Sequence, residues 1–143
     1  MTDPTTETSY FRPLPHLSGL TGQWYSFLTA HELRFQRCTA CGRWRHVPRE
    51  YCARCGSDAF EWALSAGRGK VFTWTTTYRY LHPGFIEDVP YASVVVELDE
   101  GPRVMTWVTG LEPEELEMEM PVEVWFDDVT DEVTLAKFTR AQG

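Results

Sequence analysis

The chain has 143 residues, of which 43% are apolar and 14% aromatic, so its composition is that of one globular domain or two small ones that share a core. Its formal net charge is −8, from 13 Lys and Arg against 21 Asp and Glu, which disfavours a protein that binds nucleic acid through a broadly basic surface. No run of about 18 uncharged apolar residues is present, so we expect no transmembrane helix, and the start of the chain, MTDPTTETSY, lacks the pattern of a signal peptide. We therefore expect a cytoplasmic, reducing location, where paired cysteines favour metal binding over disulfides.

Apolar residues recur at helical spacing between Leu17 and His31. They are Leu17, Leu20, Trp24, Phe27 and Leu28, which fall on one face of an α-helix. Ser18 or Thr21 is suited to cap this helix. Residues 1–31 are therefore expected to form a mobile leader and an N-terminal helix.

The rest of the chain is predicted to be mainly β. A short strand over residues 32–37 leads into the cysteine segment, and residues 32–66 are expected to form a four-Cys zinc ribbon. β-Branched and aromatic residues then predict five strands, over residues 70–80, 90–98, 103–109, 121–127 and 133–138, with a helical turn before the fourth. This order is typical of a five-stranded OB-fold barrel, to which we assign residues 67–143, and an antiparallel sandwich is the alternative.

The four cysteines form two CxxC pairs, Cys38 with Cys41 and Cys52 with Cys55, separated by ten residues. Each pair can fold as a tight turn that directs both sulfurs at one ion, so the four thiolates suit tetrahedral Zn²⁺, or iron in the same cage. Four thiolates leave no open coordination position, which predicts a structural metal rather than a catalytic one.

Neighbouring residues support this prediction. Gly42 and Gly56 directly follow the second cysteine of each pair, where such a turn often needs a positive φ. A thioredoxin-like redox site would instead have a single CxxC at the start of a helix. His46 lies between the pairs, is not needed as a ligand and is expected to be exposed.

The order of these motifs resembles the family of small rubredoxin-like zinc-ribbon and OB-fold proteins associated with acyl-CoA enzymes. The resemblance covers about residues 17–138, and its most specific pieces are the two CxxC pairs, Gly67-Arg68-Gly69, Pro83-Gly84-Phe85, Val89-Pro90-Tyr91, Leu98-Asp99-Glu100-Gly101 and Met120-Pro121-Val122. The chain departs from the family pattern at Glu119, where Gly is usual, and after Phe138, where Pro is often found. The resemblance implies a partner of the thiolase, hydroxymethylglutaryl-CoA synthase, hydratase or sterol side-chain aldolase type, and acyl-CoA as a ligand.

Basic residues are concentrated around the cysteines: residues 31–79 hold nine bases and four acids, whereas residues 97–132 hold thirteen acids and one base. Arginine suits the phosphates of CoA because its planar fork donates two hydrogen bonds at once. A solvated face that keeps the ribbon soluble is the alternative. The residues that we predict to contact CoA are Arg43, Arg45, Arg68, Lys70 and Phe85.

Two segments are candidates for a partner interface. The apolar face of the helix would need a partner if the helix lay outside the barrel, and otherwise it belongs to the core. The loop over residues 81–89 has apolar residues at its tip, which would either insert into a partner or fold back over the barrel. The predicted interface residues are Leu20, Trp24, Phe27, Leu28, Phe85 and Ile86.

The resulting hypothesis is a non-catalytic subunit of a thiolase-like acyltransferase or carbon–carbon lyase complex, which closes or positions the acyl-CoA site of its partner. The alternative is an OB-fold protein that binds single-stranded nucleic acid, for which Phe72, Trp74, Tyr78 and Tyr80 would line one face of a strand. The acidic charge of the barrel opposes that alternative. A stand-alone enzyme is disfavoured because the sequence holds no recognisable catalytic motif.

Overall fold

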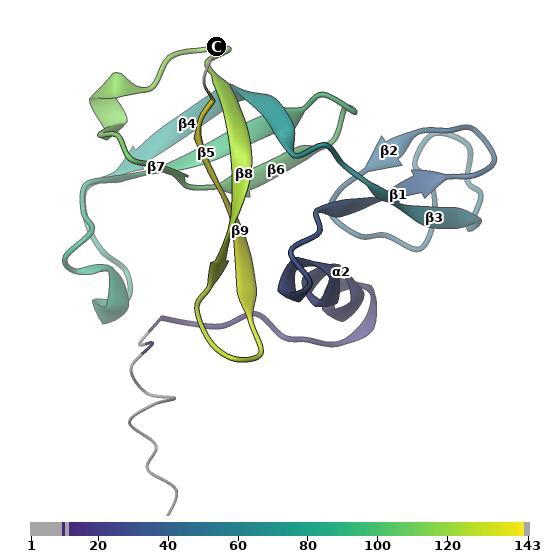
Figure 1. Cartoon of the computed structure of the whole chain (residues 1–143), viewed down its shortest axis with the longest axis horizontal. Helices are drawn as coiled ribbons and strands as arrows, with labels where there is room; N and C mark the ends of the chain where they lie inside the picture. The colour runs from purple at the N-terminus through teal and green to yellow at the C-terminus, as the bar shows by residue number, and fades with distance from the viewer. Residues whose placement is uncertain (1–9, 11, 142–143) are drawn as a thin grey trace, which may run out of the picture.

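The computed structural model describes Tyr10 and residues 12–141, so nearly all of the expected leader lies outside the described residues. A small three-stranded ribbon lies beside a larger β-barrel domain, and one helix packs between them (Figure 1). None of the described helices is long and apolar enough to cross a membrane.

The helix α2 spans Gly19–Thr29, and its N-cap is Ser18, one of the two predicted candidates, although the Ser18 side chain makes no capping hydrogen bond. Its backbone carbonyl instead accepts a bond from the Gly22 N–H at 2.9 Å. The helix lies against β1 (Arg34–Cys38) and β9 (Thr134–Arg140). It therefore joins the two parts of the molecule.

The ribbon sheet has the order β2-β1-β3, with β2 at Trp44–Arg45 and β3 at Phe60–Leu64. All its pairs are antiparallel, and the β1–β3 register runs from Arg34 opposite Leu64 to Cys38 opposite Phe60. Cys38 is the last residue of β1, and the other three cysteines lie in the loops beyond this end of the sheet.

The barrel strands form one sheet of order β6-β5-β4-β8-β9-β7. Their bounds are β4 Arg68–Thr77, β5 Tyr91–Leu98, β6 Arg103–Thr106, β7 Val108–Thr109 and β8 Pro121–Asp128, followed by β9. Single 3-10 turns η1 and η2 occupy Pro83–Phe85 and Pro113–Glu115, and η2 is the helical turn expected before the fourth strand. The OB-fold prediction is confirmed.

The segment predicted as one strand over residues 103–109 is divided at Trp107. Its first part, β6, pairs antiparallel with β5, and its second part, β7, pairs parallel with β9 at the opposite edge of the sheet. The Trp107 carbonyl accepts the Phe138 N–H at 3.0 Å, and the Thr106 hydroxyl donates to the Ala136 carbonyl at 2.8 Å. One continuous segment thus connects both edges of the sheet.

A β-bulge overturns the prediction of an aromatic stripe along β4. The register with β5 shifts between Val71 and Thr73, so Phe72 is the extra residue and is exposed, whereas Trp74 packs against the core. A bulge of this kind reverses which face later residues occupy. Tyr78 and Tyr80 lie beyond the end of the strand, so the four rings form no common stacking face.

One hydrophobic core serves the whole molecule. Trp24 and Leu28 of the helix and Phe35 of the ribbon belong to the same buried cluster as the barrel strands. The barrel contributes alternate residues such as Ala92, Val94, Val96 and Leu98 of β5, as expected for strands with one face inward. The ribbon and the helix are therefore part of the barrel's packing rather than appendages.

Candidate functional site

The two CxxC turns have the same backbone geometry. In the first, the Cys38 N–H bonds the Arg43 carbonyl at 2.8 Å and the Gly42 N–H bonds the Cys38 carbonyl at 2.8 Å. In the second, the Cys52 N–H bonds the Ser57 carbonyl at 2.9 Å, and the Gly56 N–H bonds the Cys52 carbonyl at 2.8 Å. Gly42 and Gly56 have φ of 81° and 79°, which confirms the reason for glycine at both positions.

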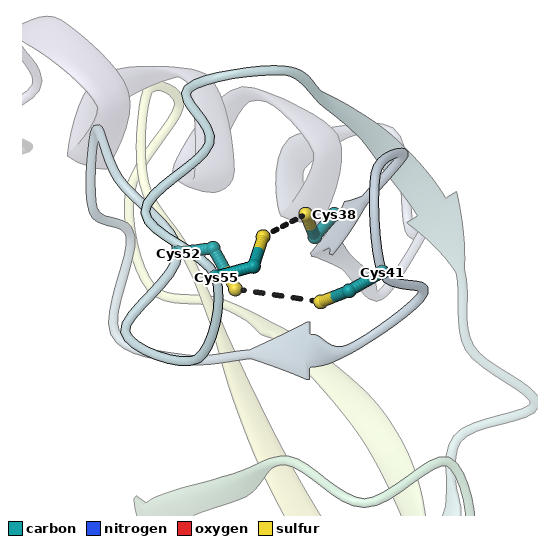
Figure 2. A group of neighbouring side chains, drawn as sticks. All are labelled: Cys38, Cys41, Cys52 and Cys55. Atoms are coloured by element: carbon teal, nitrogen blue, oxygen red, sulfur yellow. Dashed lines mark hydrogen bonds between the residues drawn. The ribbon is translucent and has the colours of Figure 1, made fainter.

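These turns bring all four sulfurs to one point (Figure 2). Cys38 and Cys55 Sγ are 3.6 Å apart, as are Cys41 and Cys52 Sγ, and the four atoms lie within 4.8 Å of one another. A tetrahedral ion with Zn–S bonds of about 2.3 Å separates its sulfurs by about 3.8 Å. The donor set and its dimensions therefore fit a four-thiolate metal, and the residues form a zinc-ribbon site.

Backbone N–H groups prepare two of the four thiols, those of Cys38 and Cys52, for a cation. Those of Cys55 and Arg54 lower the pKa of Cys52 to about 6, and that of Cys41 is the main cause of a lowered pKa at Cys38. Thiolate is the form that binds metal, so these bonds favour ligation. Cys38 and Cys52 are buried while Cys55 is exposed, so the site lies near the surface of the ribbon.

The residues predicted to contact CoA fall into separate places. Arg43 and Arg45 line a hollow of about 510 Å³ between the ribbon and the barrel, which we call the ribbon hollow. Arg68 instead pairs with Glu123 at 3.1 Å, and Lys70 lies 3.9 Å from Glu97. The structure therefore does not bring the five predicted residues together.

The remaining predicted CoA residue, Phe85, folds back onto the barrel. Its ring lies 5.8 Å from that of Tyr91 and 6.0 Å from that of Trp107, and the Arg12 guanidinium is 4.6 Å above it. Arg12 also forms an ion pair with Asp88 and donates to the Gly84 carbonyl at 3.0 Å. Ile86, the residue after Phe85, is 52% exposed and remains as the apolar tip of the loop.

The predicted helix interface needs a correction. Trp24 and Leu28 are 7% and 0% exposed and fill the core of this chain, because α2 packs against β1 and β9 instead of standing outside the barrel. Phe27 is half-buried against Trp62, with ring centroids 5.4 Å apart. Only the half-buried Leu20 and Phe27 of the four helix residues retain surface for a partner.

His46 also differs from expectation, because it is largely buried rather than exposed. Its ring lies 4.8 Å from that of Trp24 and 5.4 Å from that of Phe35. This burial lowers the pKa of His46 to about 4, so the ring is neutral at physiological pH.

Family models match both parts of the chain: the rubredoxin-like zinc ribbon domain of ChsH2 over residues 27–61, and the C-terminal OB-fold domain of ChsH2 over residues 62–127. A DUF35 domain-containing scaffold protein of Pyrococcus furiosus is 37% identical over 71% of this chain and 73% of its own length. A chain of the solved Ltp2-ChsH2(DUF35) aldolase superposes with a TM-score of 0.80 at 32% identity, over 89% of this chain and 98% of that one. The chain belongs to the ChsH2/DUF35 family.

Longer relatives of this ChsH2/DUF35 protein carry additional sequence. The 3-oxo-4,17-pregnadiene-20-carboxyl-CoA hydratase alpha subunit of Mycobacterium tuberculosis is 33% identical over 82% of this chain. A probable enoyl-CoA hydratase alpha subunit of Thermomonospora curvata is 34% identical over 91% of it. The chain spans about two fifths of the length of these curated subunits, 37% and 40% respectively.

Sequence reasoning missed two residues at or behind the ribbon hollow of this ChsH2/DUF35 protein, Gln36 and Arg103. Gln36 does not line the hollow but is fully buried and bonds Arg45 and Arg49, which do; it lies in a strand between Phe35 and Arg37, where nothing in the local pattern distinguishes it. Arg103 comes from the acidic half of the chain and reaches the hollow only through the β5–β6 turn. Arg49 belongs to the basic segment that the charge pattern did identify.

Proposed function

We propose that this chain is a non-catalytic, scaffold-type subunit of a complex that acts on acyl-CoA, with a thiolase-like aldolase or acyltransferase as its partner. The observation that carries the proposal is the match to nearly the whole ChsH2(DUF35)-type chain of the Ltp2-ChsH2(DUF35) aldolase, with a TM-score of 0.80. The hydratase subunits among the relatives support the same chemical context, because their names contain CoA substrates.

The polar groups of the fold support an accessory role. His31, Asp128 and Thr134 form a hydrogen-bonded group, with His31 Nε2 3.0 Å and Thr134 Oγ1 2.5 Å from the Asp128 carboxylate. In a catalytic triad the imidazole lies between the carboxylate and the hydroxyl. Here both groups bond the same carboxylate, and Thr134 is 1% exposed, so the arrangement is suited to tying the turn after helix α2 to the β8–β9 hairpin.

The finer part of the proposal is that the chain helps to hold CoA at the partner's active site. Of the predicted contacts, Arg43 and Arg45 are best suited, because both line the ribbon hollow and neither forms an ion pair among the described residues. Arg68 and Lys70 already lie beside carboxylates, so their side chains are less available to bind a phosphate.

The test is co-expression with a thiolase-like protein encoded by the same organism, followed by size-exclusion chromatography with mass determination. We expect a hetero-oligomer that cleaves or forms a carbon–carbon bond in an acyl-CoA, and no turnover by the isolated chain. Turnover by this chain alone, or failure to associate with any such protein of its organism, contradicts the proposal.

A further inference from the structure

A second cavity, which we call the helix cavity, lies between helix α2 and the barrel. The segment before the helix lines it with Tyr10 and Arg12, the helix lines it with Trp24 and Tyr25, and strands of the barrel complete it. Its volume of about 390 Å³ is in the range of small-molecule sites. No described residue lines both this cavity and the ribbon hollow, so the two are separate places on the molecule.

The barrel wall of the helix cavity is rich in aromatic rings. Phe85 of η1, Tyr91 of β5 and Trp107 all line it. The ring of Tyr91 lies 5.1 Å from that of Trp107 and 5.8 Å from that of Phe85. Rings in contact with one another present their faces and edges in fixed positions, against which a further ring can pack. Met105 also lines the cavity and adds a thioether, which packs favourably against ring edges.

Two cations line the helix cavity, and both are already neutralised. The Arg12 guanidinium forms an ion pair with Asp88, and Lys137 Nζ lies 2.6 Å from the Asp127 carboxylate. Both cations also lie over the Trp107 ring, at 5.2 and 5.4 Å from its centroid. An anion would have to displace a carboxylate from its cation, whereas an uncharged ligand leaves both pairs intact.

The other polar groups of the cavity include hydroxyls that stay neutral. Burial raises the pKa of Tyr25 and is the main cause of a raised pKa at Tyr10. Ser93 of β5 contributes a further hydroxyl to the lining. A neutral hydroxyl can both donate and accept a hydrogen bond, so it suits a hydroxyl or keto oxygen of a ligand. Apolar walls with a few polar groups are the usual composition of a site for a small molecule.

The segment before the helix is held in place as one side of the cavity. Arg12 Nε donates to the Gly84 carbonyl at 3.0 Å, and the Arg12 guanidinium lies 4.6 Å from the centroid of the Phe85 ring. These contacts join the segment to the η1 turn. The wall therefore exists before a ligand arrives, which lowers the entropic cost of binding.

We infer that the helix cavity binds an uncharged ring compound, with Tyr91 and Trp107 packed against the ring and the Tyr25 hydroxyl available to a polar substituent. The inference does not rest on the proposed function, because the cavity is separate from the ribbon hollow and its walls come from this chain alone. The aromatic walls select a ring, and the two completed ion pairs select a ligand without charge.

The test is a titration of the full, zinc-loaded chain by saturation-transfer difference NMR, with naphthol and naphthoate as probes. The two probes share one ring system, but naphthol is uncharged at neutral pH and naphthoate is an anion. We expect naphthol to bind and naphthoate to bind at least about 10-fold more weakly, because the anion must compete with Asp88 or Asp127 for its cation.

Two variants separate the contributions of the rings and of the charges. Tyr91→Ala should weaken naphthol binding about 10-fold, because it removes a ring from the wall. Tyr78→Ala is the matched control, since Tyr78 is a 73% exposed tyrosine of the same domain that does not line the cavity. Asp127→Asn should raise the affinity for naphthoate and leave that for naphthol unchanged, because it frees Lys137 from its carboxylate. Metal content and thermal unfolding show which variants are folded.

Failure of the unaltered chain to bind naphthol, or equal losses in Tyr91→Ala and Tyr78→Ala, overturns the inference. If Tyr91→Ala does not fold, Asp127→Asn decides by itself: equal affinities for naphthol and naphthoate in this variant and in the unaltered chain contradict the choice of an uncharged ligand. If Tyr91→Ala loses a partner protein while the unaltered chain binds no naphthol, the cavity is a protein contact and the inference is wrong.

Discussion

At the scale of single residues, the cysteine sulfurs and their backbone donors explain why the ribbon can exist. Its two-residue strand β2 and five-residue strands β1 and β3 offer few backbone pairs. A metal held by four thiolates adds a binding free energy of about 10–16 kcal/mol in comparable small zinc sites, and this energy contributes to folding.

Cys52→Ser is therefore expected to lose the bound metal and to unfold the ribbon. Cys52 is buried and its thiol accepts the N–H groups of Cys55 and Arg54, so serine cannot replace its role as a thiolate ligand. Metal analysis by mass spectrometry and circular dichroism would measure both effects. A well-folded Cys52→Ser protein without metal would show that the metal is not structural.

His46 predicts a pH dependence of stability. Its folded pKa of about 4 lies below the unfolded value of 6.5, so the unfolded chain binds the proton more readily. This stabilisation is present above pH about 6.5 and is lost as the pH falls toward 4, by at most roughly 3 kcal/mol. Urea unfolding of the native protein and of His46→Phe across this range measures the difference, since the variant lacks the titrating group. Parallel pH profiles for the two proteins would contradict the assignment.

At the scale of the elements, helix α2 packs between the ribbon and the barrel and contacts both. Trp24 contacts the ribbon through His46 and belongs to the common core, while Leu20 is half-buried at the same face. Burial rather than helix propensity therefore holds this short helix in place.

Trp24→Ala is expected to lower the free energy of unfolding by about 3–5 kcal/mol, because it leaves a large cavity in a shared core. Leu20→Ala, which removes a half-buried side chain, is the control and should cost about 1 kcal/mol or less. Denaturant unfolding measures both. Equal losses of unfolding free energy in the two variants would mean that α2 does not support the core as described.

At the scale of the whole molecule, the barrel presents an apolar loop that the described residues, Tyr10 and 12–141, leave uncovered. Leu81 is 93% exposed and Ile86 is 52% exposed, on either side of η1, while Phe85 is turned back toward Trp107. Exposed apolar loop tips commonly mark protein contacts.

Ile86→Glu should therefore weaken association with the proposed thiolase-like partner at least about 10-fold while leaving the metal content and thermal unfolding unchanged, because it places a charge in an apolar contact. Co-purification and analytical ultracentrifugation measure the association. Val47→Glu, at a 50% exposed residue on the ribbon, is the matched control. If only the Val47→Glu variant loses the partner, the docking surface lies on the ribbon instead.

The amino-acid sequence alone was sufficient for the metal site and most of the strands, because both depend on residues that are close together in the chain. The two CxxC spacings with Gly42 and Gly56, and the alternation from Tyr91 to Leu98, predict local structure directly. Tertiary structure decided the rest. It buried Trp24, shifted the β4–β5 register after Val71 and divided the predicted strand at Trp107. It also paired Arg68 with Glu123 and left Arg43 without an ion pair among the described residues. Each of these outcomes depends on a neighbour supplied by a distant segment, and no local spacing specifies which segments meet.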